Sequence, residues 1–213
     1  MNLEEERRKL VRQLRREITD QRVLEVMERL PRELFIPLAS RAFAYDDRPL
    51  PIGDGQTISQ PFIVALMTQA LGLVGTEKVL EVGTGSGYQA AILAQMAREV
   101  VSVERFPDLA ATAERTLEDM GYTNVQVHLA EGTLGWRAGA PYDAILVTAA
   151  APSVPRELVA QLAVGGRMVI PVGSRWEQDL LKVTKQADGL KIQTLTACRF
   201  VPLVGEEAWS EEP

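Results

Sequence analysis

Val79-Leu-Glu-Val-Gly-Thr-Gly-Ser-Gly-Tyr88 is an apolar run that leads directly into a glycine-rich turn. Glycines at positions 83, 85 and 87 allow the backbone to turn tightly and allow a ligand to lie against it without a Cβ in between. A dinucleotide-binding G-x-G-x-x-G pattern would place its third glycine at position 88, where this chain has Tyr88. The stretch therefore predicts a strand, a ligand-binding turn and a helix, with a spacing that disfavours a dinucleotide.

Short apolar runs alternate with helical stretches around this motif. We predict strands over 78–82, 100–103, 125–129, 144–147 and 167–172, and helices over 89–97, 108–120 and 155–162. Five strands that alternate with helices predict a doubly wound, mostly parallel α/β sheet with helices on both faces. Beyond Gly173, an Asp188-Gly189 turn between strands at about 178–185 and 190–201 predicts an antiparallel hairpin that closes one edge of the sheet.

The N-terminal part of the chain does not show this alternation of strands and helices. A helical pattern runs from residue 3 to about residue 30, with a break predicted at Thr19 or Asp20. Prolines and glycines make residues 31–61 loop-rich, and a helix is predicted from about Ser59 to Leu71, with Ser59 in the position of an N-cap. We interpret the whole chain, 1–213, as a single domain: a helical and loop-rich extension on the substrate side (1–74) and a cofactor-binding α/β core (75–213).

The composition restricts the classes of function. A net charge of −6 has the wrong sign for a protein that binds nucleic acid by neutralising phosphates. One cysteine, Cys198, and one histidine, His128, predict no internal disulfide and no metal site, and we interpret both as structural residues. No apolar run approaches the roughly 18 residues of a membrane helix, so we expect a cytoplasmic protein without a membrane partner.

Three acidic residues lie at or near the ends of successive predicted strands. Glu81 lies two residues before Gly83, Glu104 ends the next strand, and Glu131 with Gly132 follows the strand over 125–129. Ligands of open α/β sheets bind at the carboxyl ends of the strands, where Glu104 could accept hydrogen bonds from ribose hydroxyls and the Glu131-Gly132 pair could meet an adenine edge. An acid just before the glycines disfavours a pyrophosphate and favours a cation. S-adenosylmethionine carries an ammonium and a sulfonium, so Glu81 could complement that end directly or through water.

Several stretches together resemble the protein-L-isoaspartate O-methyltransferases. The most specific is Gly55-Gln-Thr-Ile-Ser-Gln-Pro61, and further matches lie at 31–37, 49–54, 80–89, 141–152 and 199–205. The resemblance implies a Rossmann-like class I methyltransferase fold. It also implies that a methyl group passes from S-adenosylmethionine to the α-carboxylate of L-isoaspartyl residues in damaged proteins and peptides. The products would be S-adenosylhomocysteine and an ester that collapses to a succinimide, which starts repair.

The resemblance also implies roles for individual residues. Ser59 matches the active-site serine of the family. The expected cofactor contacts are Gln56, Thr57, Ile58, Ser59, Glu81, Gly83, Thr84, Gly85, Gly87, Glu104, Glu131 and Gly132. Many relatives carry aspartate where this chain has the longer Glu131, which leaves open whether its contact with adenine is direct. The segments 49–61 and 201–209 are expected to close over a bound ligand.

The expected chemistry requires no histidine. A carboxylate with a reference pKa of about 3.5 is ionised at neutral pH, so no general base is needed, and we interpret Ser59 as a group that positions the carboxylate. Two alternatives stay open: a methyltransferase that acts on a small molecule, and a non-catalytic binding module on the same fold. The sequence leaves the oligomeric state open, with a monomer included.

Overall fold

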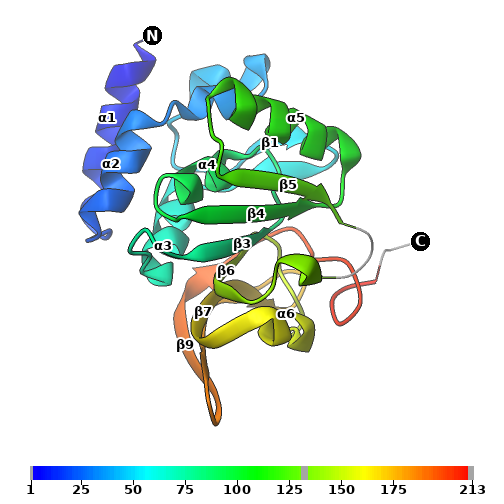
Figure 1. The fold of residues 1–213 in the computed structure, drawn as a ribbon. Helices are drawn as coiled ribbons and strands as arrows, with labels where there is room; N and C mark the ends of the chain where they lie inside the picture. The colour runs from blue at the N-terminus through cyan, green and yellow to red at the C-terminus, as the bar shows by residue number, and fades with distance from the viewer. Residues whose placement is uncertain (1, 131–133, 211–213) are drawn as a thin grey trace.

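The computed structural model describes residues 2–130 and 134–210 (Figure 1). The α-helices are α1 (Leu3–Leu14), α2 (Gln21–Arg29), α3 (Pro61–Leu71), α4 (Tyr88–Ala94), α5 (Pro107–Asp119) and α6 (Arg156–Gln161), with short 3-10 helices η1 (Arg32–Phe35), η2 (Leu38–Phe43) and η3 (Arg137–Gly139). The strands are β1 (Leu50–Gly53), β2 (Gln56–Ile58), β3 (Lys78–Val82), β4 (Glu99–Glu104), β5 (Val125–Leu129), β6 (Tyr142–Val147), β7 (Leu162–Gly173), β8 (Gln178–Gln186) and β9 (Gly189–Cys198). No helix in these described ranges is long and apolar enough to cross a bilayer.

Seven strands form one central sheet in the order β5-β4-β3-β6-β7-β8-β9. The first five in this order are parallel, and β7-β8-β9 are joined by antiparallel pairing. The order reverses between β3 and β6, which places the carboxyl end of β3 at the switch point where open α/β sheets bind ligands. The predicted fold class, including the C-terminal antiparallel hairpin, is confirmed.

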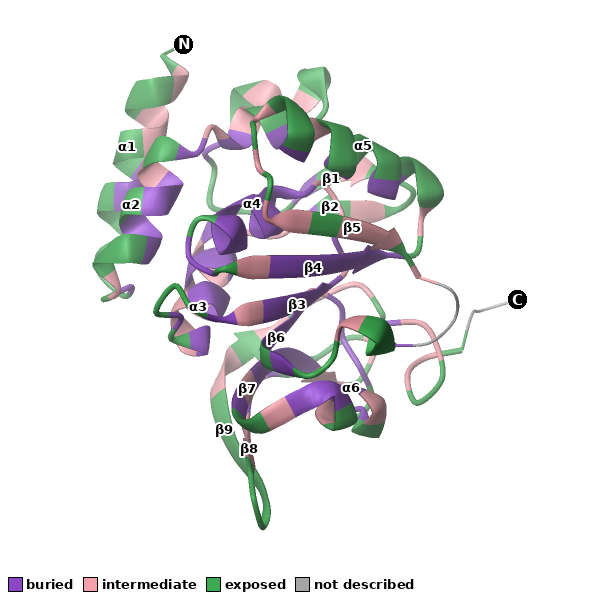
Figure 2. Ribbon diagram, viewed as in Figure 1, coloured by how far each residue is buried: buried purple, intermediate pink, exposed green. Residues whose placement is uncertain are grey.

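The central strands are buried on both faces, as Figure 2 shows for β3 and β4. Alternate residues enter two separate hydrophobic cores, because successive side chains of a strand point to opposite faces. Val79 packs with α1 to α4 on one face, whereas Leu80 and Val82 pack with Leu158 of α6 on the other. Helices therefore cover both faces of the sheet, as predicted.

Two parts of the structure differ from the sequence prediction. Residues 31–61 contain η1, η2 and a small antiparallel pair in which Leu50 of β1 faces Ile58 of β2, so this segment is more regular than a loop. The strand β7 begins at Leu162, five residues before its predicted start at Arg167. Its pairing with β6 shifts in register between Tyr142 and Ala144, and that irregularity accommodates the extra residues.

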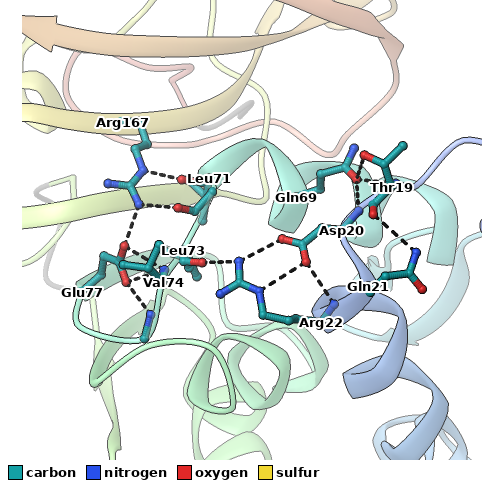
Figure 3. Close-up of polar contacts among 12 residues, drawn as sticks. Thr19, Asp20, Gln21, Arg22, Gln69, Leu71, Leu73, Val74, Glu77 and Arg167 are labelled. Carbon is teal, nitrogen blue, oxygen red and sulfur yellow. Dashed lines mark hydrogen bonds and ion pairs between the residues drawn. The ribbon is translucent and has the colours of Figure 1, made fainter.

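The C-terminal end of α3 is fastened to the sheet by Arg167 of β7 (Figure 3). Arg167 donates to the carbonyl oxygens of Leu71 and Gly72, the latter at 2.8 Å from Nη2, and forms an ion pair of 2.8 Å with Glu77. The Glu77 carboxylate also accepts the backbone N–H groups of Val74, Gly75 and Thr76 at 3.0–3.1 Å. This network fixes the turn between α3 and β3.

The same helix is fastened on its other side to the segment before α2. Gln69 accepts hydrogen bonds from the backbone N–H groups of Thr19 and Asp20 at 2.7 and 2.8 Å, and Arg22 donates to the carbonyl of Leu73 at 2.5 Å (Figure 3). Asp20 is the N-cap of α2 and accepts the N–H of Arg22 at 3.0 Å, which confirms the predicted helix break. Helix α2 and the segment before it are thus connected by polar contacts to α3 and to the turn after α3.

Candidate active site

The glycine-rich turn joins β3 to α4 and forms the floor of the candidate site. Gly83, Gly85 and Gly87 have φ angles of 99°, 53° and 85°, which L side chains rarely adopt. A Cβ on Gly83 would lie 2.3 Å from Oγ1 of Thr148, whose hydroxyl donates to the Gly83 carbonyl at 2.6 Å. The loop backbone can therefore take this path only because position 83 has no side chain.

Glu104 ends β4 beside this turn and is a buried residue, 5% exposed. One oxygen accepts the N–H of Gly85 at 2.7 Å, and the other accepts the N–H groups of Arg105 and Phe106 at 2.8 and 3.1 Å. These three bonds hold the carboxylate at the rim of the turn. A carboxylate has about four acceptor positions, so capacity remains for a ligand hydroxyl.

Glu81 lies below the turn and does not line the cleft. It is fully buried, its Oε2 accepts a hydrogen bond from Ser102, and its Oε1 has no partner. Burial raises the pKa of Glu81 to about 8. The hydrogen bond from Ser102 opposes this rise, and the negative charge of Glu104 adds a smaller increase. Ser102 in turn contacts Thr84 at 2.6 Å between hydroxyl oxygens, so these two hydroxyls connect Glu81 to the cleft.

A cleft lies along the carboxyl edge of the sheet, with about 990 Å³ of empty space when the open solvent at its mouth is included. Eight of the predicted contacts line it: Gln56, Thr57, Ile58, Ser59, Gly83, Thr84, Gly85 and Glu104. Gly87 does not line the cleft, and the predicted contacts Glu131 and Gly132 lie outside the described residues. The antiparallel pair β1–β2 lies against the glycine turn, since Ile52 of β1 is 3.4 Å from the position of a Cβ on Gly85.

Ser59 stands between β2 and α3, and its predicted role as the N-cap of that helix is wrong. Helix α3 begins at Pro61, its N-cap is Gln60, and the first free amide, that of Phe62, is accepted at 2.8 Å by the side chain of Asp47. The second carboxylate oxygen of Asp47 accepts a hydrogen bond from the side-chain Nε2 of Gln60 at 3.0 Å. In the described part of the chain the Ser59 hydroxyl has no hydrogen-bond partner, so it is available to a ligand in the cleft.

Other lining residues were not identified from the sequence. They include Val64 and Met67 of α3, Thr148 and Ala149 after β6, Arg105 and Phe106 after Glu104, and Leu134 and Gly135. The segments after β4 and β6 could have been suspected because every strand end at this edge faces the same crevice. The two α3 residues lie three positions apart on one helical face, a pattern that does not distinguish a cleft wall from a core.

The segment after β9 covers the cleft from a further side. Residues 201–204 line it, and Leu203 donates to the carbonyl of Ala150 at 2.8 Å while Ala150 donates to Val201 at 2.8 Å. Gln178 of β8 accepts the N–H of Phe200 at 2.9 Å. The two segments expected to close over a ligand both contribute to the walls of one cleft, and their closure stays a prediction.

The lone histidine and cysteine lie outside the cleft lining. His128 of β5 stacks on Trp136 with a centroid distance of 4.0 Å and an interplanar angle of 4°. Burial raises the pKa of the Cys198 thiol to about 11, which keeps it protonated and unreactive at neutral pH. Neither side chain is placed to take part in chemistry in the cleft.

Comparison with known proteins identifies close relatives. A family model described as protein-L-isoaspartate(D-aspartate) O-methyltransferase matches residues 5–208, a range that includes every described segment lining the cleft. A protein-L-isoaspartate O-methyltransferase of Syntrophus aciditrophicus is 55% identical over 198 residues, which cover 92% of this chain and 91% of the relative. Another, of Geobacter metallireducens, is 53% identical over 215 residues, with 100% of both chains covered.

Solved structures give the same result. A protein-L-isoaspartate O-methyltransferase superposes with a TM-score of 0.83 and 32% identity, covering 93% of this chain and 66% of the other. A protein-L-isoaspartate O-methyltransferase from Plasmodium falciparum, solved in complex with S-adenosyl-L-homocysteine, has a TM-score of 0.78 and 26% identity, with 92% and 96% covered. The similarity therefore extends over nearly the whole of this chain in both sequence and fold.

Proposed function

The chain belongs to the protein-L-isoaspartate(D-aspartate) O-methyltransferase family, and we propose from this membership how its cleft holds the two partners of a methyl transfer. The enzyme transfers a methyl group from S-adenosylmethionine to the α-carboxylate of L-isoaspartyl residues in damaged proteins. The resulting ester collapses to a succinimide, and repair starts there. Peptides that carry the same linkage are proposed as further substrates.

The glycine turn and Glu104 fit the cofactor. The backbone at Gly83 and Gly85 offers a surface without side chains, and the fixed Glu104 carboxylate retains acceptor capacity for a ribose hydroxyl. S-adenosylmethionine supplies a methyl group that its sulfonium has already activated. The residues of this chain then need only bind the donor, exclude water and aim the acceptor.

Ser59 carries the proposal for the substrate side of the cleft. Ser59 lines the same cleft as Glu104 and the glycine turn, and its hydroxyl has no partner among the described residues. The isoaspartyl carboxylate is anionic at neutral pH, so no residue has to remove a proton from it. A neutral hydroxyl donor at Ser59 can orient the carboxylate and leaves oxygen lone pairs free to attack.

The test compares two peptides and one substitution. Methyl uptake is expected with an isoaspartyl peptide and not with its normal aspartyl twin. Ser59→Ala should lower kcat/KM by roughly 10- to 150-fold, the range that corresponds to about 1.5–3 kcal/mol for a hydrogen bond to a charged group, and leave the affinity for S-adenosylhomocysteine nearly unchanged. Ser40→Ala, in η2 and outside the cleft lining, is the control.

Three results would contradict the proposal. Equal methylation of both peptides would remove the substrate assignment. If neither peptide is methylated while S-adenosylhomocysteine still binds, the result would favour a methyltransferase that acts on a small molecule. A larger loss in cofactor affinity than in turnover for Ser59→Ala would move Ser59 to the cofactor side.

A further inference from the structure

Arg32 of η1 is a charged residue that the proposed reaction does not use, although it lies directly behind Ser59. Its side chain is fully buried, with 0% exposure. Nε donates to the carbonyl of Ala44 at 2.9 Å and Nη2 donates to the carbonyl of Ser59 at 3.0 Å. The guanidinium carbon lies 5.0 Å from the ring centroid of Tyr88, the first residue of α4.

The burial of this guanidinium is unfavourable by itself. None of the described carboxylates forms an ion pair with Arg32, and its Nη1 has no hydrogen-bond partner. Burial lowers the pKa of Arg32, with only partial compensation from Tyr88, Tyr45 and Asp47. A buried charge without an ion pair is weak evidence for a stabilising role, because an apolar side chain of similar volume is often at least as stable.

The contacts of Arg32 indicate that its role is to hold the segment around Ser59 in place. Ser59 is fixed on its N-terminal side by the pairing of Leu50 with Ile58, and beyond it by Asp47, which holds Gln60 and the start of α3. Ser59 itself is held through its carbonyl, and Arg32 is the donor.

Arg32 also connects the two sides of the cleft. Tyr88, under the guanidinium, follows the glycine turn directly and lines the cleft with Ser59. The Phe35 and Tyr88 rings pack edge to face at a centroid distance of 5.4 Å, and both residues belong to the hydrophobic core. One buried guanidinium therefore links the segment assigned to the substrate with the helix that follows the cofactor turn.

We propose that Arg32 is a positioning residue for methyl transfer, which holds the Ser59 carbonyl and thereby keeps the Ser59 hydroxyl aimed at the substrate carboxylate. The inference rests on the role proposed for Ser59. Because Arg32 is bonded to the backbone of Ser59, Ser59→Ala leaves the bond in place, and the two side chains can be removed independently. A double-mutant cycle therefore measures whether Arg32 acts through Ser59.

The experiment measures kcat and KM for an isoaspartyl peptide with wild type, Arg32→Met, Ser59→Ala and the double variant, and S-adenosylhomocysteine binding by calorimetry for each. Arg32→Met should lower kcat/KM by about 10- to 100-fold, because a misplacement of about 1 Å can cost that much. In the Ser59→Ala background the same change should cost less than about threefold. Arg32→Lys, which keeps a positive charge and N–H donors but lacks the planar guanidinium fork, should recover part of the loss and also serves if Arg32→Met does not fold.

Arg167→Met is the matched control. Arg167 also donates to two backbone carbonyls, at the other end of α3 and away from the cleft, so its removal should lower the melting temperature and leave kcat/KM unchanged. An equal loss from Arg32→Met in both backgrounds, or no loss at all, would overturn the proposal for Arg32 alone. If Ser59→Ala leaves kcat/KM unchanged, that result would instead overturn the role of Ser59 on which the inference rests.

Discussion

Glu81 shows how the position of a residue within a strand decides what its charge can do. It was expected to complement the cation of the cofactor, yet its side chain points into the sheet face that Val79 also enters. Glu104 is the last residue of its strand and reaches the cleft, whereas Glu81 is followed by Val82 before its strand ends. An indirect link through Ser102 and Thr84 is the arrangement that the structure contains.

The raised pKa of Glu81 predicts a pH-dependent cost to stability. The pKa of about 8 in the folded chain lies above the ordinary value of 4.5, so between these values the unfolded chain releases a proton that the folded chain keeps. The free energy of unfolding should therefore fall by about 1.4 kcal/mol for each pH unit in that window, and change no further above it. Glu81→Gln, which cannot ionise, should remove this fall.

Urea unfolding of wild type and Glu81→Gln at about pH 5, pH 6.5 and pH 8 measures the effect as a difference between the two proteins, in which other titrating groups cancel. The advantage of the variant should grow with pH. A difference that stays constant would show that Glu81 is ionised in the folded protein.

At the scale of single residues, local pattern predicted some placements and missed others. Gly83 and Glu104 could be placed because a strand end and its turn are encoded within a few neighbouring residues. Arg32 could not, since its partners are backbone carbonyls 12 and 27 residues away, and no side-chain pattern records them. Ser59 was found only through family resemblance.

The start of α3 is an element whose stability depends on a residue outside it. Asp47 accepts the N–H of Phe62 at 2.8 Å and so supplies the cap that neither Ser59 nor Gln60 provides. Asp47→Ala should lower the free energy of unfolding by about 0.5–2 kcal/mol, the range for loss of an N-cap, and Asp47→Asn, which keeps an acceptor, by less. Urea titration at neutral pH checks both.

If Asp47 acts as a helix cap, the free energy of unfolding should decrease in the order wild type, Asp47→Asn, Asp47→Ala. If the two variants are equally destabilised, the contribution comes from the charge of Asp47 and its bond to Gln60. If neither is destabilised, the contact with Phe62 contributes nothing measurable.

Elements were predictable where periodicity was unbroken. The strands β3, β4, β5 and β6 lie within one residue or two of their predicted bounds, because apolar runs between turns specify buried strands. The start of β7 was missed because Gly165 and Gly166 interrupt its apolar run, although the strand continues through an irregular register. The β1–β2 pair was missed for a similar reason: its prolines concealed an Asp54-Gly55 turn, in which both residues have positive φ.

At the scale of the whole molecule, the N-terminal helices share a core with the sheet. Buried residues of α1 to α4 form one hydrophobic cluster with Val79, Val100 and Leu146 of the central strands. The polar contacts of Gln69 and Arg22 add to this connection (Figure 3). We propose on this basis that residues 1–74 and 75–213 unfold together as a single domain.

The proposal predicts that a destabilising substitution in α2 also shifts the unfolding transition of the C-terminal part of the chain. All three tryptophans lie between residues 136 and 209, so their fluorescence reports only on the C-terminal part, whereas far-ultraviolet circular dichroism reports on all helices. Leu24→Ala, at a fully buried position of α2, should lower the free energy of unfolding by about 2–5 kcal/mol and shift both transitions together. Glu25→Ala, exposed on the same helix, should shift neither by more than about 0.5 kcal/mol. If Leu24→Ala moves the dichroism transition while the tryptophan transition stays in place, the N-terminal helices unfold separately, and the chain contains two units in place of one.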